Sequence, residues 1–129
     1  MDMNDPLLAS QHVVQICLFV FAAIGLFGGA LQMYLGQPET APRLDNVHRF
    51  MAGVYFGTGV ICLWAGITVR QQDTLVYLIA FGIFLAGVGR LVSMSQVGVP
   101  KPTALWLGYL VPELLVPWIM VAAQIASKR

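Results

Sequence analysis

Residues 13–35 read VVQICLFVFAAIGLFGGALQMYL, an apolar run that contains no charged side chain. A bilayer core is about 30 Å thick, and a helix crosses it with roughly 20 residues, so this run is long enough to span a membrane. Three more runs of similar length follow it. The sequence therefore predicts four membrane spans, at about residues 13–35, 50–69, 75–94 and 104–126.

The overall composition agrees with a chain that is embedded in lipid. Hydrophobic residues make up 58% of the 129 residues and charged residues only 10%, against about 25% charged residues in an average soluble domain. A soluble domain needs more polar residues than this to cover its surface. The formal net charge of +1 argues against a nucleic-acid partner, which calls for clustered lysine and arginine. We therefore expect the lipid bilayer to be the main partner and no nucleic acid to bind.

The four spans are expected to be helices of a single transmembrane domain over residues 1–129. Backbone groups inside a bilayer have no water to bond with and must satisfy one another, while the strands of a barrel would alternate and be about half as long. The connections at about residues 36–42, 70–73 and 98–103 are short, which makes consecutive helices antiparallel neighbours. The predicted fold class is all-α, an antiparallel up-down-up-down four-helix bundle.

Small residues recur in the spans at helix-packing spacing. They are Gly25, Gly29, Gly53, Gly57, Gly82, Ala86 and Gly89. Small residues four positions apart let two helix backbones approach closely where no hydrophobic effect drives association. We interpret them as packing inside the bundle, and an interface with a second copy or with another membrane protein is the alternative.

The orientation follows from the positive residues near the span ends, because cytoplasmic loops carry an excess of lysine and arginine. An even number of spans places both termini on one side. That side carries Arg70, Lys128 and Arg129, and the other carries Arg43, Arg49 and Lys101. This near tie favours, by a small margin, termini in the cytoplasm.

Two ionisable residues fall inside the predicted spans. Arg90 lies roughly 9 Å below the end of the third span, and Glu113 lies roughly 13 Å into the fourth span from the same side. A charge at the centre of a membrane helix costs at least about 2.5–3.5 kcal/mol, and pairing is the ordinary remedy. The sequence therefore predicts an Arg90–Glu113 ion pair. The pair either fastens the third helix to the fourth or forms a functional polar site.

Two prolines, Pro112 and Pro117, stand beside this glutamate. Each removes one helical hydrogen bond and leaves the carbonyl four residues earlier without that donor, at Gly108 and at Glu113 itself. We expect the fourth helix to be kinked here, with bare carbonyl oxygens near the carboxylate. Such backbone is tolerated at membrane depth where it faces protein or a water-lined cavity.

These features together predict one pocket with a charged mouth and an apolar body. Residues 45–49 would form the mouth, and the alternative for them is an interfacial cap with a snorkelling arginine. A pocket of this kind suits an amphipathic guest, lipid-like or quinone-like, and no other cofactor is predicted. The predicted ligand-binding residues are Asp45, His48, Arg49, Tyr55, Arg90, Ser93, Trp106, Tyr109 and Glu113.

Other kinds of site lack their sequence signatures. The two histidines, His12 and His48, begin spans one and two at opposite faces of the membrane, which excludes one haem held by both. The sequence has no HExxH, GxSxG or phosphate-binding glycine loop, and no metal site is predicted. Cys17 and Cys62 lie in apolar runs, and we interpret them as free buried thiols.

Three stretches carry a resemblance to a known family. They are NVHRFMAGVYFG at residues 46–57, GRLVS at residues 89–93 with the following Gly98, and PEL at residues 112–114. They resemble a bacterial family of small four-span membrane proteins that is defined only as a domain of unknown function, in the DoxX-like group. The resemblance covers nearly the whole chain. It implies the fold and a plasma (inner) membrane location, and it marks Arg49, Arg90, Ser93 and Glu113 as pattern residues.

The resemblance carries no activity over, although some DoxX-like relatives are linked to quinone-dependent oxidoreductases or act as accessory subunits. Our leading hypothesis is a non-enzymatic accessory or assembly protein that binds a lipid-like molecule or partner helices through Arg49, Arg90 and Glu113. The rival is an enzyme for a small apolar substrate. In it, Glu113 would be the general acid or base, Arg90 would stabilise negative charge, and His48 or Tyr55 would shuttle a proton. A third hypothesis is a small proton- or cation-coupled transporter that uses Glu113 and the freed carbonyls. In each case we expect the site in the half opposite the termini and almost pure packing in the other half.

Overall fold

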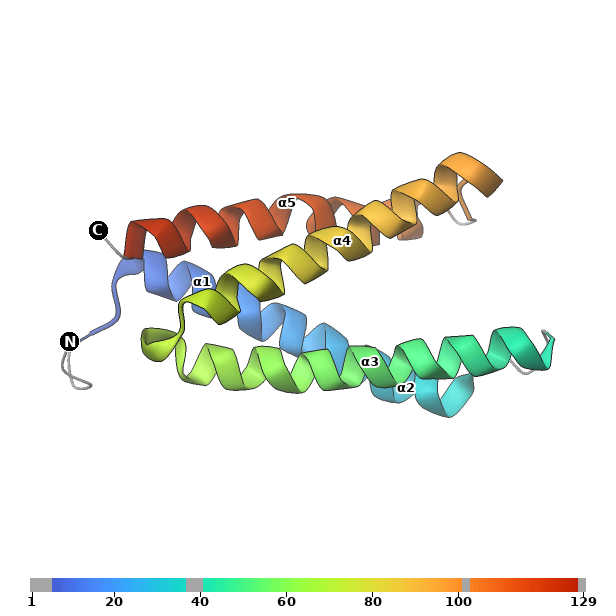
Figure 1. Cartoon of the computed structure of the whole chain (residues 1–129), viewed down its shortest axis with the longest axis horizontal. Coiled ribbons are helices and arrows are strands. Elements are labelled where there is room, and N and C mark those ends of the chain that lie inside the picture. The colour runs from blue at the N-terminus through green and yellow to red at the C-terminus, as the bar shows by residue number, and fades with distance from the viewer. Residues whose placement is uncertain (1–5, 37–40, 101–102, 128–129) are drawn as a thin grey trace. The chain divides into compact units, whose positions relative to one another are not determined.

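The computed structural model describes residues 6–36, 41–100 and 103–127, and every regular element in those residues is a helix (Figure 1). The first helical stretch is continuous, but its middle turn has π-helical geometry. Its three parts are α1 (Ala9–Ala23), the π-helix η1 (Ile24–Gly28) and α2 (Gly29–Leu35). The other elements are α3 (Pro42–Ile67), the short 3-10 helix η2 (Val69–Gln71), α4 (Thr74–Val97) and α5 (Thr103–Ser127).

Four helical stretches are long and apolar enough to cross a membrane. They are Ala9–Leu35, Pro42–Ile67, Thr74–Val97 and Thr103–Ser127, and each coincides with a predicted span. The prediction of an all-α chain with four membrane-spanning helices is therefore confirmed, and their antiparallel packing is consistent with a four-span bundle. The protein is an integral, multi-pass protein of the lipid bilayer.

The second of these helices, α3, begins at Pro42, well before the predicted start near Phe50. Ala41 is extended at the N-cap and proline takes the first turn, where the missing N–H of proline has no helical partner to lose. Asp45 also lies in this first turn, where the helix dipole favours a carboxylate. Residues 42–49 are too polar for a hydrophobicity window to include them, so this start could not be predicted from hydrophobicity.

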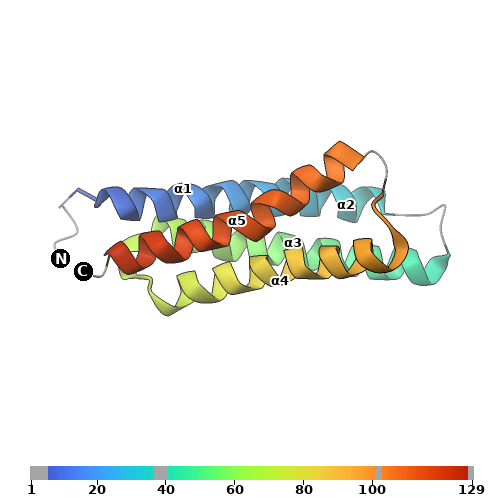
Figure 2. The same cartoon turned by 90° about the horizontal axis from the view of Figure 1, so that it is seen from above.

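The chain divides into two compact units. The N-terminal unit comprises residues 15–69 and holds most of α1 together with η1, α2 and α3. The C-terminal unit comprises residues 70–129 together with residues 1–14, and it holds α4 and α5. Figure 2 shows the same helices from a second direction. The single domain over residues 1–129 stays a prediction.

In the N-terminal unit, backbone packs directly on backbone where η1 and α2 cross α3. A Cβ atom added to Gly25 would lie 2.7 Å from the carbonyl oxygen of Tyr55, and one added to Gly29 would lie 2.7 Å from the backbone nitrogen of Phe56. From the opposite side, a Cβ atom at Gly59 would lie 2.7 Å from the backbone nitrogen of Leu26. No side chain can rotate away from these contacts, so the crossing requires glycine on both helices.

The predicted packing roles of the glycines are thus confirmed for Gly25 and Gly29 but not for the other glycines. A Cβ atom at Gly53 would meet only the flexible end of Met33, and one at Gly57 would meet no described atom of this unit within 4 Å. The face of α3 that meets the first helix instead carries Ala52 and Gly59, which are seven positions apart. Two antiparallel helices meet along one stripe of each. The spacing of small residues alone does not reveal which stripe that is.

The C-terminal unit is an antiparallel pair formed by α4 and α5. Gln124, near the end of α5 and buried, donates from Nε2 to the carbonyl oxygen of Gln72 at 3.0 Å and to Asp73 Oδ1 at 3.3 Å. Asp73 stands at the N-cap of α4, but its side chain makes no capping hydrogen bond. Its Oδ1 accepts from the amide of Gln124 instead.

The half predicted to lie nearer the termini contains a few polar contacts as well as apolar packing. Besides Gln124, Ser10 Oγ lies 2.8 Å from Ser127 Oγ, and Gln15 Nε2 donates to the carbonyl oxygen of Gly66 at 3.0 Å. Each of these polar groups satisfies a partner within its own unit. Uncharged amides and hydroxyls occur often in membrane helices, so their positions in the sequence do not by themselves predict these contacts.

Candidate functional site

The predicted ion pair is present at the centre of the α4–α5 unit. Arg90 Nε donates to Glu113 Oε2 at 2.8 Å, and the two side chains are only 23% and 15% exposed. Measured along the helices at 1.5 Å per residue, Arg90 lies about 10 Å from the end of α4 and Glu113 about 15 Å from the start of α5. The two charges therefore meet well inside the membrane-spanning segments and neutralise each other.

Two aromatic residues on α5 lie beside the guanidinium. Arg90 Cζ lies 5.7 Å from the ring centre of Trp106 and 5.5 Å from that of Tyr109. The two rings meet edge to face with centres 5.7 Å apart. Guanidinium groups within about 6 Å of a ring centre are attracted to its face. Arg90 is thus held by one carboxylate and two rings, all from the same neighbouring helix.

A glycine of α4 sets the distance between the two helices at this level. Gly87 is buried, and a Cβ atom added to it would lie 2.8 Å from Leu114 Cδ2 and 3.2 Å from Glu113 Cβ. It stands one turn before Arg90, so it lets α5 approach where Glu113 must reach the guanidinium. The predicted small residues Gly82 and Gly89 do not have this role, because a Cβ atom at either would meet no described atom of the unit within 4 Å.

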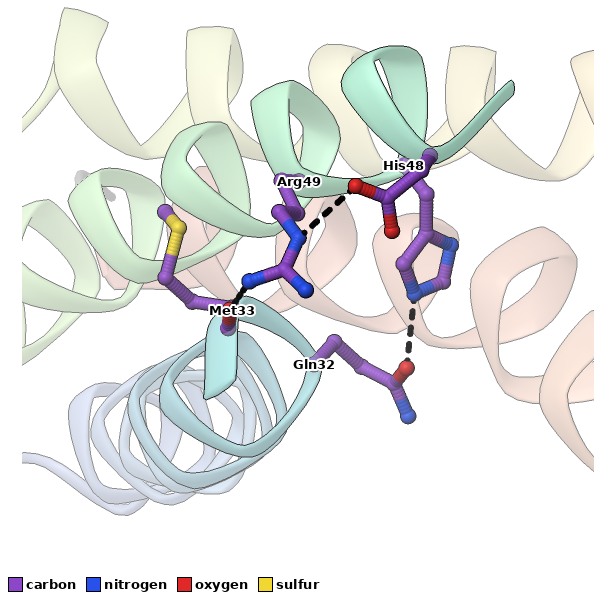
Figure 3. A network of polar contacts seen from close by, with 5 residues as sticks. Gln32, Met33, His48 and Arg49 are labelled. Carbon is purple, nitrogen blue, oxygen red and sulfur yellow. Dashed lines mark hydrogen bonds and ion pairs between the residues drawn. The ribbon is translucent and has the colours of Figure 1, made fainter. Parts of the chain in front are cut away.

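The N-terminal unit has its own polar cluster, at the end of α2 (Figure 3). Arg49 Nη1 donates to the carbonyl oxygen of Met33 at 2.9 Å, and Arg49 Nε donates to Asp45 Oδ2 at 3.0 Å. The carbonyl belongs to the last turn of α2, where helix carbonyls lack an internal partner and favour a cation. Arg49 therefore joins the C-terminal end of one helix to the N-terminal carboxylate of the next.

Gly36 follows α2 directly and makes room for this arrangement. It has a φ of 60°, a left-handed value that favours glycine, and a Cβ atom there would collide with the Arg49 guanidinium. Beside it, His48 Nε2 and Gln32 Oε1 form a hydrogen bond of 2.7 Å (Figure 3). The contacts of Arg49 with Met33 and of His48 with Gln32 connect α2 with α3, whereas the Arg49–Asp45 pair lies within α3.

Seven of the nine predicted residues thus fall into two groups that belong to different units. Arg90, Trp106, Tyr109 and Glu113 contact one another in the C-terminal unit, and Asp45, His48 and Arg49 belong to the cluster of the N-terminal unit. Tyr55 is exposed on α3 with its carbonyl against Gly25, and Ser93 is exposed on α4. Ligand binding by any of them stays a prediction.

Sequence reasoning missed Gln32 and Met33 as partners of this cluster. The amide of Gln32 is one of few polar groups in the first span, which was a usable signal. The carbonyl of Met33 carried no signal, because any residue in the last turn of a helix offers one. Of the two thiols, Cys62 is buried, Cys17 is half-buried, and both are free.

The C-terminal unit also has an apolar groove, with a volume of about 220 Å³. Aromatic side chains of Tyr77, Phe81, Phe84 and Trp118 line it together with Pro117. Phe84 and Trp118 meet edge to face with ring centres 5.5 Å apart. The groove lies toward the start of α4 and the end of α5, and none of the nine predicted residues lines it. The α5 helix continues through both of its prolines.

Comparison with known proteins adds one relationship. The model of the family described as Domain of unknown function (DUF4345) matches residues 10–124, which covers the four long helices almost completely. Neither the search of curated proteins nor that of solved structures finds a match.

Proposed function

We propose that this chain, which belongs to the DUF4345 family of domains of unknown function, is a non-enzymatic membrane accessory protein. It binds the polar head of a lipid-like or quinone-like molecule at Arg90 and Glu113. The proposal depends on one observation: an ion pair well inside two membrane-spanning helices, with the guanidinium held against two aromatic rings.

A pair that served only to fasten two helices would be a costly fastening. Placing two charges in a low-dielectric interior carries a desolvation penalty that their attraction often fails to exceed, and apolar residues of similar volume pack as well or better. The α4–α5 unit already has apolar packing at Gly87 and Leu114 and between Phe84 and Trp118. Ionisable residues in membrane segments are a functional hypothesis by default.

The chemistry of the pair suits recognition of a polar head. A guanidinium offers five N–H donors in a planar fork, and a carboxylate offers two acceptor oxygens. Trp106 and Tyr109 add flat apolar surfaces beside the donors. We further propose that the protein is related to the DoxX-like group and resides in a bacterial inner membrane. There it would assist a membrane-bound partner. The carbonyl oxygens of a quinone head would accept from the guanidinium.

Native mass spectrometry of the protein extracted with its surrounding membrane lipids tests the proposal. We expect a small amphipathic molecule to co-purify with the wild-type chain, at a level at least about tenfold above that with Glu113→Gln. Glutamine keeps the size of the side chain but removes the charge that orients Arg90.

Asp73→Asn is the matched control for this substitution. It also converts a carboxylate to an amide, but at the start of α4, and the remaining Oδ1 can still accept from Gln124. Retention of the molecule should be unchanged in this variant. Equal retention by wild type and Glu113→Gln, or loss in both variants alike, would refute the proposed site.

A further inference from the structure

The charges around the ion pair point to the class of molecule that it accepts. We infer that the Arg90–Glu113 site selects an uncharged amphiphile whose head carries both a hydrogen-bond donor and an acceptor, such as a hydroxyl beside a carbonyl or ether oxygen. This inference rests on the proposed function and specifies its ligand. Long-chain alcohols and monoacylglycerols share this chemistry.

The two charges of the site balance each other. Arg90 and Glu113 contact each other at 2.8 Å with exposed fractions of 23% and 15%, so the site has a net charge of zero before any ligand arrives. A charged head would bring a third, uncompensated charge to membrane depth. Such a charge is penalised strongly, because neither water nor a counter-ion surrounds it there.

The described residues of the C-terminal unit place no further counter-ion beside the pair. Among the described residues of the C-terminal unit, the other charged residues are Arg70 and Asp73, and the histidine is His12. Arg70 and Asp73 precede α4, and Asp73 lies about 25 Å along the helix axis from Arg90. His12 belongs to the opening turns of α1. Apart from Glu113, the α5 side chains beside Arg90 are the uncharged aromatics Trp106 and Tyr109, so no described group of this unit beside the pair neutralises a charged guest.

An uncharged head can form a hydrogen bond with each member of the ion pair. A hydroxyl can donate to the carboxylate of Glu113, and a carbonyl or ether oxygen can accept from the guanidinium of Arg90. Hydrogen bonds to charged groups are about twice as strong as those between neutral groups. A head with both functions therefore gains from each member of the pair without separating them.

Competition binding in nanodiscs of zwitterionic lipid tests the inference with four probes that share one alkyl chain. They are a monoacylglycerol, a fatty alcohol, an alkyl sulfonate and an alkyltrimethylammonium. For the wild-type protein we expect the two uncharged probes to bind at least about tenfold more tightly than either charged probe. If the head needs an acceptor oxygen in addition to its hydroxyl, the monoacylglycerol should bind more tightly than the fatty alcohol.

Variants that change the charge of the site should reverse its preference between charged and uncharged heads. Glu113→Gln leaves the site with one positive charge, so it should come to prefer the sulfonate. Arg90→Gln leaves one negative charge, so it should come to prefer the trimethylammonium. The double variant restores neutrality and should restore the preference for uncharged heads.

The outcomes separate this inference from the proposal beneath it. Binding of all four probes with equal affinity, unchanged by the variants, would overturn the inference while leaving a site. Failure of every probe to bind wild type at this position would overturn the proposed function itself. If a single variant does not fold, the wild-type ranking and the double variant still decide.

Discussion

The two units hold their helices together in opposite ways. In the N-terminal unit, Gly25 and Gly29 place one backbone directly on another, and the charged cluster is at the helix ends. In the C-terminal unit, Gly87 meets a leucine side chain, and the charged pair lies between the helices. A seam of backbone on backbone leaves no space for a charged pair, whereas a seam of side chains can enclose one.

The largest expected effect tests the backbone seam. Gly29→Ala should lower the free energy of unfolding by about 3 kcal/mol, the upper end of the usual range for overpacking, because its Cβ atom would lie 2.7 Å from a backbone nitrogen and 2.8 Å from a backbone carbonyl oxygen. Equilibrium unfolding in mixed micelles measures it. The neighbouring Gly28→Ala is the control, since no described atom lies within 4 Å of its Cβ position. Equal losses in the two variants would show that the seam is not what Gly29 provides.

The next effect tests the enclosed pair. Glu113→Gln should lower the free energy of unfolding by about 2 kcal/mol, because removing one member leaves the other charge buried without its partner. The loss should be smaller than for a fully buried pair, because the Arg90 and Glu113 side chains are 23% and 15% exposed. In the same unfolding assay, the double variant Arg90→Gln/Glu113→Gln should lose less than the single one. A larger loss in the double variant would mean that the pair acts by packing and not by charge.

Part of this comparison could be predicted from the sequence. Length and hydrophobicity determine where helices cross a membrane, so the four spans follow from residue type alone. The ion pair also follows, because Arg90 and Glu113 are the only acid and base inside the predicted spans and they lie at matching depth. The depth of a polar residue along its helix follows directly from its position in the sequence.

The rest depends on the rotation of each helix about its axis, which the sequence does not record. Gly57 and Gly82 have the same small side chain as Gly29 and Gly87, yet only the latter two meet a neighbour. The contact of Asp73 with Gln124 depends on where the end of α5 lies. The unpredicted early start of α3 at Pro42 depends on polar residues that hydrophobicity does not register.

A moderate effect distinguishes the two kinds of seam at a single position. Gly87→Ala should lower the free energy of unfolding by about 1 kcal/mol, less than Gly29→Ala, because its Cβ atom would first meet the flexible end of Leu114, which can move. Combining it with Leu114→Ala should leave less than the sum of the two single losses. Gly82→Ala, on the same helix and facing open space within its unit, should be neutral. Additive losses would mean that Gly87 and Leu114 do not share the contact.

The smallest effect concerns the charges at the end of the backbone seam. Arg49→Gln should lower the free energy of unfolding by at most about 1 kcal/mol, because the Arg49 side chain is 40% exposed and exposed pairs of this spacing contribute about 0.3–0.5 kcal/mol. A double-mutant cycle with Asp45→Asn measures that coupling, and raising the salt concentration should reduce it, whereas the stability contribution of the Arg90–Glu113 pair should hardly respond to salt. If the Arg49 coupling exceeded that of Arg90 with Glu113, the clamp at the helix ends would be the more strongly constrained site, and the place to search for a ligand would move from α4 and α5 to the N-terminal unit.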